Sequence, residues 1–312
     1  MIIAPGVYPS LSMADYLALP CASASLIKAI VNECPRAAWF ESWLNPDHER
    51  DDTKASDAGT IAHAIILEGS TDGVVVIDPN DHPAEKTGAI PVGFTNKSIR
   101  AARDDARAAG KIPVLLADMQ TIMNMVASAQ IFIASLETTE PAIWAAFQPD
   151  GGESEVSFIF DDDGTLCRMR PDRISKDRKL IVDVKTSAMS VEPDHFGRSL
   201  MPDYRISASF YRRGCLALFD TTPDYVFLCI EQNAPHLCSL IGVPPAGYEI
   251  ADEKVEYGLR EWRRCVAANV WPAYEPRVYY VDPSPWEMAQ WMERAEAAPV
   301  RGKVDYSLGE QA

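Results

Sequence analysis

The stretch RMRPDRISKDRKLIVDVKTS, residues 168–187, constrains the fold of this chain more than any other segment. It reads as a hairpin of two strands around the tight turn SKDR, and its second strand is apolar apart from Asp183 and Lys185. Side chains two positions apart on a strand lie on the same face, so Asp183 and Lys185 project together while the neighbouring valines face the opposite side. The segment therefore predicts a buried sheet that ends in a charged site.

The pattern of apolar residues changes at Gly151. Before it, helical spacing predicts helices at 22–32, 35–44, 57–69, 97–109 and 117–147, with one short strand inside a long loop at 69–96. After it, strands are expected at 153–160, 165–171 and 179–186, then a helix at 203–219, strands at 224–232 and 237–244, and helices at 247–268 and 285–297. This order predicts an α/β or α+β fold with a central sheet, flanking helices and a helical N-terminal elaboration.

We expect one globular unit whose parts follow these changes in pattern. The predicted parts are a helical N-terminal part at 1–150, a core at 151–245, C-terminal helices at 246–298 and a loose tail at 299–312. The N-terminus has no basic leader, and no segment approaches the roughly 20 apolar residues that span a bilayer. The sequence thus predicts a cytoplasmic protein without membrane contact.

Charge and cysteine content limit the kinds of partner and cofactor. The 29 basic and 45 acidic residues leave a net charge of −16, which argues against a protein that coats nucleic acid. Any DNA contact should be confined to a local basic channel, for which the candidates are Lys97, Arg100, Arg103 and Arg107, or Arg212 and Arg213. The seven cysteines are scattered without a C-x-x-C pair, which is typical of free thiols and not of disulfides or a zinc site.

The hairpin brings chemically active groups together. If the turn folds back as expected, Asp172 on the first strand lies near Asp183, and Lys185 stands beside them. Two clustered carboxylates repel each other unless a cation lies between them, and such oxygen ligands suit Mg²⁺ or Mn²⁺. The lysine can then orient or deprotonate a metal-bound water. A purely structural ion pair is the alternative that the short motif leaves open.

The motif Pro171-Asp172, ten residues, then Asp183-Val184-Lys185 resembles the signature of the PD-(D/E)XK nuclease superfamily, which has a restriction-endonuclease-like core. Other segments resemble one branch, the phage and prophage RecE-type (exonuclease VIII-like) exonucleases. These segments are MADYLALPCASASLIKAIVNECPRAAWF, AGTIAHAIILEG, GKIPVLLADMQTIMNMVASA, ESEVSFIFDDDGTLCRMRPDRI and ANVWPAYEPRVYYVDPSPWEM. They follow the family's order over most of residues 12–290.

The resemblance implies a function and a site. A Mg²⁺- or Mn²⁺-dependent enzyme would degrade linear double-stranded DNA from its ends, 5′→3′, as a ring-shaped oligomer that cooperates with a single-strand annealing protein in phage recombination. The implied metal ligands are His63, Asp172, Asp183 and the Val184 carbonyl, with Lys185 and Tyr211 as further catalytic residues. Glu155, Ser207, Arg170 and Arg173 are supporting candidates.

Several of these assignments have alternatives. His63 could be a core histidine on an apolar helix, Glu155 a plain strand charge, and the arginines partners of the surplus acids. Ser207 stands where the branch usually has a glutamine, four residues before Tyr211, which puts activity in doubt. Cys34-Pro35 resembles the first cysteine of iron–sulfur-bearing relatives, but Cys265 has no neighbours at ligand spacing, so no cluster is expected.

Two rival functions remain at the level of sequence. One is a RecB- or Cas-type nuclease acting on single strands, against which the absence of helicase motifs and of the cysteine set speaks. The other is a catalytically silent nuclease-fold protein that binds DNA or a partner, which Ser207 and the negative charge favour. Metal-dependent cleavage would separate an enzyme from a binding protein.

Overall fold

The computed structural model describes residues 3–48 and 57–297. The chain forms two compact units, Met1–Ala273 and Tyr274–Ala312, and the second contains helix α10 (Pro285–Ala297). The tail predicted at 299–312 lies outside the described residues, and the boundaries predicted at 150, 245 and 298 stay predictions. Among the described helices, none combines the length and apolar composition needed to cross a membrane.

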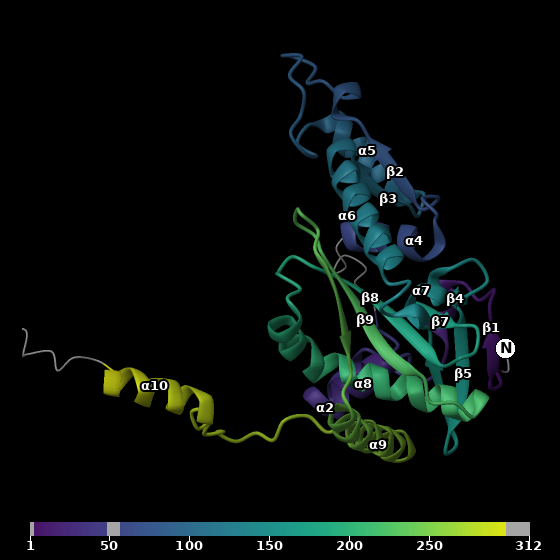
Figure 1. Ribbon diagram of the computed structural model, residues 1–312, viewed down its shortest axis with the longest axis vertical. Coiled ribbons are helices and arrows are strands. Elements are labelled where there is room, and N and C mark those ends of the chain that lie inside the picture. The colour runs from purple at the N-terminus through teal and green to yellow at the C-terminus, as the bar shows by residue number, and fades with distance from the viewer. Residues whose placement is uncertain (1–2, 49–56, 298–312) are drawn as a thin grey trace, which may run out of the picture. The chain divides into compact units, whose positions relative to one another are not determined.

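A five-stranded mixed sheet forms the centre of the first unit (Figure 1). Its order is β10 (Cys238–Gly242), β9 (Asp224–Glu231), β8 (Leu180–Ser187), β7 (Arg173–Ser175) and β4 (Gly152–Ser154). Strands β8 and β9 run parallel over the whole length of β8, and the other neighbours are antiparallel. The predicted α/β class, with a central mixed sheet flanked by helices, is confirmed.

Alternation along β8 divides the apolar core between the two faces of this sheet. Ile181 packs on one face with helices α2 (Ala24–Asn32), α8 (Pro193–Phe219) and α9 (Pro245–Ala268). Val182 and Val184 pack on the other face with helices α4 (Asp57–Glu68), α6 (Leu116–Ser135) and α7 (Pro141–Phe147). Residues 181, 183 and 185 share a face by strand geometry, so Asp183 and Lys185 lie on the side of α2 and α8.

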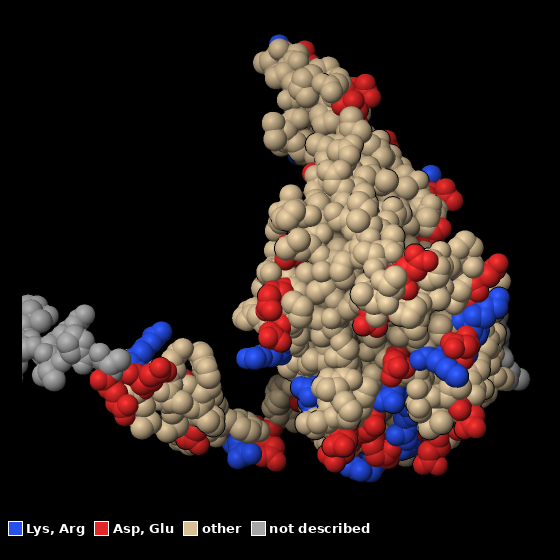
Figure 2. Space-filling view, in the orientation of Figure 1, with Lys and Arg blue, Asp and Glu red and all other residues tan. Residues whose placement is uncertain are grey.

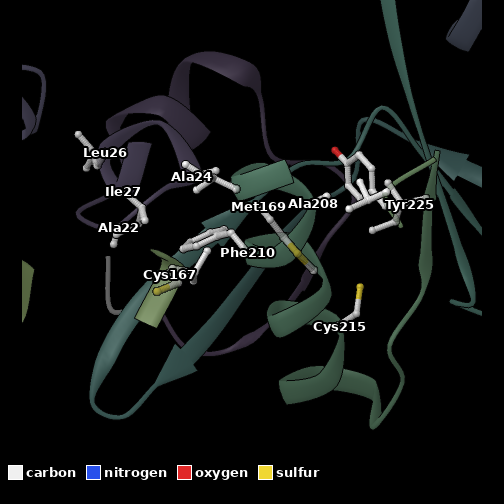
Figure 3. Close-up of a cluster of buried hydrophobic side chains, with 14 of the residues drawn as sticks. Ala22, Ala24, Leu26, Ile27, Cys167, Met169, Ala208, Phe210, Cys215 and Tyr225 are labelled. Atoms are coloured by element: carbon white, nitrogen blue, oxygen red, sulfur yellow. The ribbon is translucent and has the colours of Figure 1, made fainter. Parts of the chain in front are cut away.

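A smaller sheet of β1 (Gly6–Tyr8), β5 (Ser157–Asp162) and β6 (Thr165–Met169) completes the core on the α2 and α8 side. In Figure 3, Phe210 of α8 lies with Cys167 and Met169 of β6, and all three belong to one buried cluster with Tyr225. Gly214 permits this packing, because a Cβ there would come within 2.7 Å of the Met169 sulfur.

The three strands expected between 153 and 186 are in fact five, and this corrects the predicted hairpin. The strand expected at 153–160 is divided at Glu155, whose φ of 53° is left-handed, so β4 joins the large sheet and β5 the small one. The strand expected at 165–171 ends at Met169, and the pairing partner of β8 is the separate strand β7. The chain thus crosses between the two sheets twice, once at Glu155 and once at Pro171-Asp172.

Several other elements also differ from the expected ones. The helix expected at 117–147 is two helices, because Pro141 lacks an N–H for helix continuation and instead begins α7. Helix α8 begins ten residues before position 203, where the Glu192 side chain accepts hydrogen bonds from the first backbone N–H groups. Strand β3 (Ile112–Leu115), which pairs in parallel with β2 (Val74–Ile77), was not expected. The remaining elements are α1 (Met13–Ala18), α3 (Pro35–Phe40), η2 (Pro79–Asp81) and α5 (Lys97–Ala108).

Candidate active site

The candidate site lies where the chain makes its two crossings between the sheets. The Glu155 N–H donates to the Asp172 carbonyl at 3.3 Å, which ties the two crossings together. Strand β7 pairs with β8 only as far as Val182, so it stops short of Val184. Beyond that point the Asp172 side chain provides the next hydrogen bond to β8, because its Oδ2 accepts the Val184 N–H at 2.7 Å. Asp172 is therefore held against β8 by its own side chain as well as by the strand that follows it.

Helix α4 places an imidazole on the same carboxylate. His63 lies between the buried residues Ala62 and Ile65, and its Nε2 is 2.9 Å from Asp172 Oδ2. Its Nδ1 is 3.7 Å from Glu155 Oε1. One ligand atom from each of His63, Glu155 and Asp172 can be chosen so that all three lie within 4.8 Å of one another. An imidazole and two carboxylates at this spacing fit one divalent cation.

The charges at this cluster stabilise a positive charge at the imidazole. Burial alone would lower the pKa of His63, but the hydrogen bond to Asp172 and the charges of Asp172 and Glu155 raise it above its usual value. Burial would raise the pKa of Asp172, and the hydrogen bond to His63 together with the charge of Lys185 lowers it instead. Burial raises the pKa of Glu155, partly offset by Arg170. A cation at this point would replace the proton on His63.

Asp183 and Lys185 form a second group on the neighbouring face, and Asp183 is not part of the three-residue cluster. Asp183 Oδ1 pairs with the Lys185 ammonium, and Oδ2 accepts the Tyr225 hydroxyl at 2.7 Å. Burial raises the pKa of Asp183, as does the nearby charge of Asp172. The pKa of Lys185 is raised despite burial because of the charges of Asp183 and Asp172. Lys185 is therefore an ammonium, suited to positioning and charge stabilisation and not to accepting a proton.

Tyr211 and Ser207 lie one turn apart on α8, as expected. The Tyr211 hydroxyl donates to the Arg170 carbonyl at 3.4 Å, and its ring packs edge-on against Tyr225 with centroids 6.1 Å apart. Ser207 is buried on the same helix, beside the core. Tyr211 thus contacts the backbone next to Pro171-Asp172, whereas the Ser207 side chain has no polar partner among the described residues.

The two supporting arginines are bonded within the protein. Arg170 Nε donates to Glu155 Oε2 at 2.7 Å, and Nη1 donates to Ser157 and to the Leu11 carbonyl. Arg173 donates to Ser154 and to the carbonyls of Ala146 and Gln148. These contacts favour ion pairing and backbone support over phosphate binding. The role of the Val184 carbonyl as a ligand stays a prediction.

The arginines expected to line a basic channel also have partners. Arg103 pairs with Asp104, Arg107 lies 3.8 Å from Asp57, and Arg100 donates to the Asn96 carbonyl. Arg213 pairs with the buried Asp162, and Arg212 stacks over the Tyr248 ring at 3.7 Å. Basic and acidic side chains are interspersed over the lower part of the face in Figure 2. The seven cysteines are free thiols, and the absence of an iron–sulfur cluster stays a prediction.

Tyr225 is the residue of this site that sequence reasoning missed. It lies on β9 opposite Ile181, so its hydroxyl reaches Asp183 only because β8 and β9 pair in this parallel register. A tyrosine in an apolar strand is ordinary, and nothing in the local sequence links positions 225 and 183. Its side chain is fully buried, and its hydroxyl leaves Asp183 one oxygen for other partners.

We expect Tyr225→Phe to weaken metal binding about tenfold or more, the usual effect of losing a hydrogen bond that orients a ligand. The Asp183 carboxylate would be free to turn once it loses this bond. Isothermal titration of Mn²⁺ into each protein measures the effect. Tyr257→Phe, which removes an exposed hydroxyl on α9, is the matched control. Equal Mn²⁺ affinity in wild type and Tyr225→Phe would show that the Tyr225 hydrogen bond does not orient Asp183 for metal binding.

Comparison with known proteins identifies the family. Residues 23–282 match the family model described as PDDEXK-like domain of unknown function (DUF3799). None of the curated proteins matches the chain. Among solved structures, the chain is similar to one named Putative exonuclease from Eubacterium rectale, with a TM-score of 0.50 and 16% identity over 88% of this chain and 94% of that chain. The structure of SSO0001 has a TM-score of 0.24 and 15% identity over 56% of this chain and 80% of that chain.

At such low identity, the likeness to the first structure shows the fold alone, and it is consistent with the predicted restriction-endonuclease-like core. The second structure is too different from this chain to support a shared fold. The family match is stronger, because it covers most of the chain and includes every residue of the candidate site. The chain therefore belongs to the PDDEXK-like family DUF3799, in agreement with the PD-(D/E)XK superfamily whose signature the motif around Asp172, Asp183 and Lys185 resembles.

Proposed function

We propose that the protein is a metal-dependent nuclease that hydrolyses phosphodiester bonds of DNA. The observation that supports this proposal most is the environment of the Asp172 carboxylate. It contacts the His63 imidazole and accepts the Val184 N–H. The Asp183–Lys185 pair lies on the adjoining face of the same strand. Membership of the PDDEXK-like family supports the same chemistry. The name of the similar Eubacterium rectale protein supports an exonuclease in particular.

The residues present fit a divalent cation. His63, Glu155 and Asp172 supply one nitrogen and two carboxylates, and the two acids give the cluster a net negative charge when His63 is neutral. Carboxylate oxygens suit Mg²⁺ or Mn²⁺, and the imidazole is a common ligand of transition metals. Such a cation would polarise the phosphodiester and neutralise charge on the leaving oxygen. Asp183 would complete the ligand set through Oδ1, which now pairs with Lys185 and is not held by Tyr225.

The remaining groups prepare the site for in-line attack by water. The Lys185 ammonium is held by Asp183, so it is fixed where charge develops on the phosphate. Tyr211 supports the backbone at Arg170 and so holds the Asp172 segment in place. No covalent intermediate is required, because none of these groups needs to act as a nucleophile.

The resemblance to RecE-type exonucleases supports a finer proposal. In it, the substrate is linear double-stranded DNA that is degraded 5′→3′ from its ends. The active species would be a ring-shaped oligomer that works with a single-strand annealing protein in phage-type recombination. The acidic exterior is compatible with a ring, because a net charge of −16 would discourage duplex binding away from the channel.

Digestion of a linear duplex labelled at either the 5′ or the 3′ end tests the proposal. We expect Mg²⁺-dependent release of the 5′ label as mononucleotides, no reaction in EDTA, and no attack on a closed circular duplex. Early loss of the 3′ label would give the opposite polarity, and nicking of the circle would mean an endonuclease.

A binding protein without activity is the second candidate, and the small buried Ser207 on the face of Tyr211 is the observation that favours it. If every substrate stays intact with Mg²⁺ and with Mn²⁺, this candidate becomes the better one. A binding measurement with the same duplexes would then be the next step.

A further inference from the structure

An open cavity of about 280 Å³ lies between helix α2 and the Asp203–Tyr204 segment of helix α8. Its lining consists of Ser25, Lys28, Ala29, Asn32, Glu33, Glu41, Asp203 and Tyr204. Lys28 is the one basic residue in this set. Tyr204 of α8 joins the cavity to the site, because Lys28 Nζ lies 4.7 Å and Lys185 Nζ 4.9 Å from the centroid of its ring.

The Lys28 ammonium is poorly compensated in the protein as it stands. Among the described residues, no carboxylate lies within ion-pairing distance of Lys28, and its ammonium lies over the Tyr204 ring. Burial and the charge of Lys185 together lower the pKa of Lys28 to about 8, against the opposing charges of Asp183 and Asp203. A half-buried ammonium that lacks a partner is stabilised by any anion that enters the cavity.

We propose that Lys28 binds a backbone phosphate of the nucleic-acid strand whose neighbouring phosphate is cleaved at Asp183 and Lys185. This inference rests on the proposed nuclease function. The two ammonium groups are less than about 10 Å apart, since both lie against one ring. A DNA strand advances about 3.4 Å per nucleotide along a duplex, so this span reaches a second phosphate but not a distant one.

The acidic residues of the cavity outnumber its one lysine and limit where a phosphate can bind. Asp203 accepts a hydrogen bond from the Asn32 amide at 2.9 Å, and Glu33 and Glu41 are exposed at the rim. These carboxylates repel a phosphate from the outer side of the cavity. Lys28, over Tyr204, is then the point at which a phosphate is accepted, with the Ser25 hydroxyl as a neighbouring donor.

Equilibrium binding of a fluorescent DNA to the full chain in EDTA tests the proposal without cleavage. We expect Lys28→Met to weaken binding about tenfold, as for one charged hydrogen bond. The slope of log K against log salt should fall in magnitude by about 0.7 to 0.9, the value for one lost phosphate contact. Lys28→Arg should retain both affinity and slope. Lys176→Met, in the exposed turn between β7 and β8, is the control and should match the wild type.

The outcomes separate this inference from the proposed function. A salt slope for Lys28→Met equal to that of the wild type overturns the inference even if the wild type cleaves DNA. An equal loss of slope in Lys176→Met does the same, because the effect would then be one of general charge. A wild type that neither binds nor cleaves any DNA overturns the proposed function and the inference with it. Thermal unfolding of each variant shows whether a loss comes from misfolding.

Discussion

Lys185→Met lowers the rate of DNA cleavage by about a thousandfold or more, the effect expected when a fixed group that stabilises the transition state is removed. It also destabilises the protein by roughly 3 kcal/mol, because the buried Asp183 carboxylate is left without its ionic partner. Single-turnover cleavage measures the first effect, and urea unfolding in EDTA measures the second.

The double variant Lys185→Met, Asp183→Asn separates catalysis from stability. A neutral asparagine in place of Asp183 no longer needs a counter-charge, so the double variant should regain most of the lost stability. It should remain inactive, because the ammonium is still missing. Cleavage by Lys185→Met within tenfold of the wild-type rate would show that the lysine is structural. A double variant as unstable as the single one would contradict the ion-pair argument.

Asp172→Ala lowers the affinity for Mn²⁺ by more than about 100-fold, beyond the loss typical of a residue that only orients a ligand. Asp172 is the group on which His63 and Val184 converge, so its loss removes a ligand and frees the imidazole. Asp172→Asn keeps an acceptor for the Val184 N–H and should be the more stable variant, yet it should bind metal as poorly. Isothermal titration with Mn²⁺ and urea unfolding measure the two quantities.

The control for this prediction is Asp163→Asn in the acidic turn DDDG. Asp163 has a left-handed φ of 49°, which asparagine also tolerates, so the turn should be preserved. The sequence favours a solvated turn at this position, so the metal affinity of Asp163→Asn should match that of the wild type. If Asp163→Asn lost affinity and Asp172→Ala did not, the metal site would lie in the turn and not at the sheet crossing.

Local pattern was enough to predict the fold class and part of the site. Alternation along 180–185 predicted that Asp183 and Lys185 share a face, and the structure pairs them there. The resemblance implied that His63 and Asp172 share a metal ion, and the structure places their side chains in contact. The expected closeness of Asp172 to Asp183 follows from the register of β7 and β8, although the two carboxylates have different partners.

The sequence by itself determined which residues lie together on one element, because the periods of helix and strand act over a few residues. The tertiary structure decided how distant elements meet. Glu155 reaches His63 because the chain leaves one sheet for another there. Tyr225 meets Asp183 through the pairing of parallel strands, and Lys28 shares a ring with Lys185 through the packing of α2 on α8. Such contacts depend on register and packing across more than forty residues, which no local period encodes.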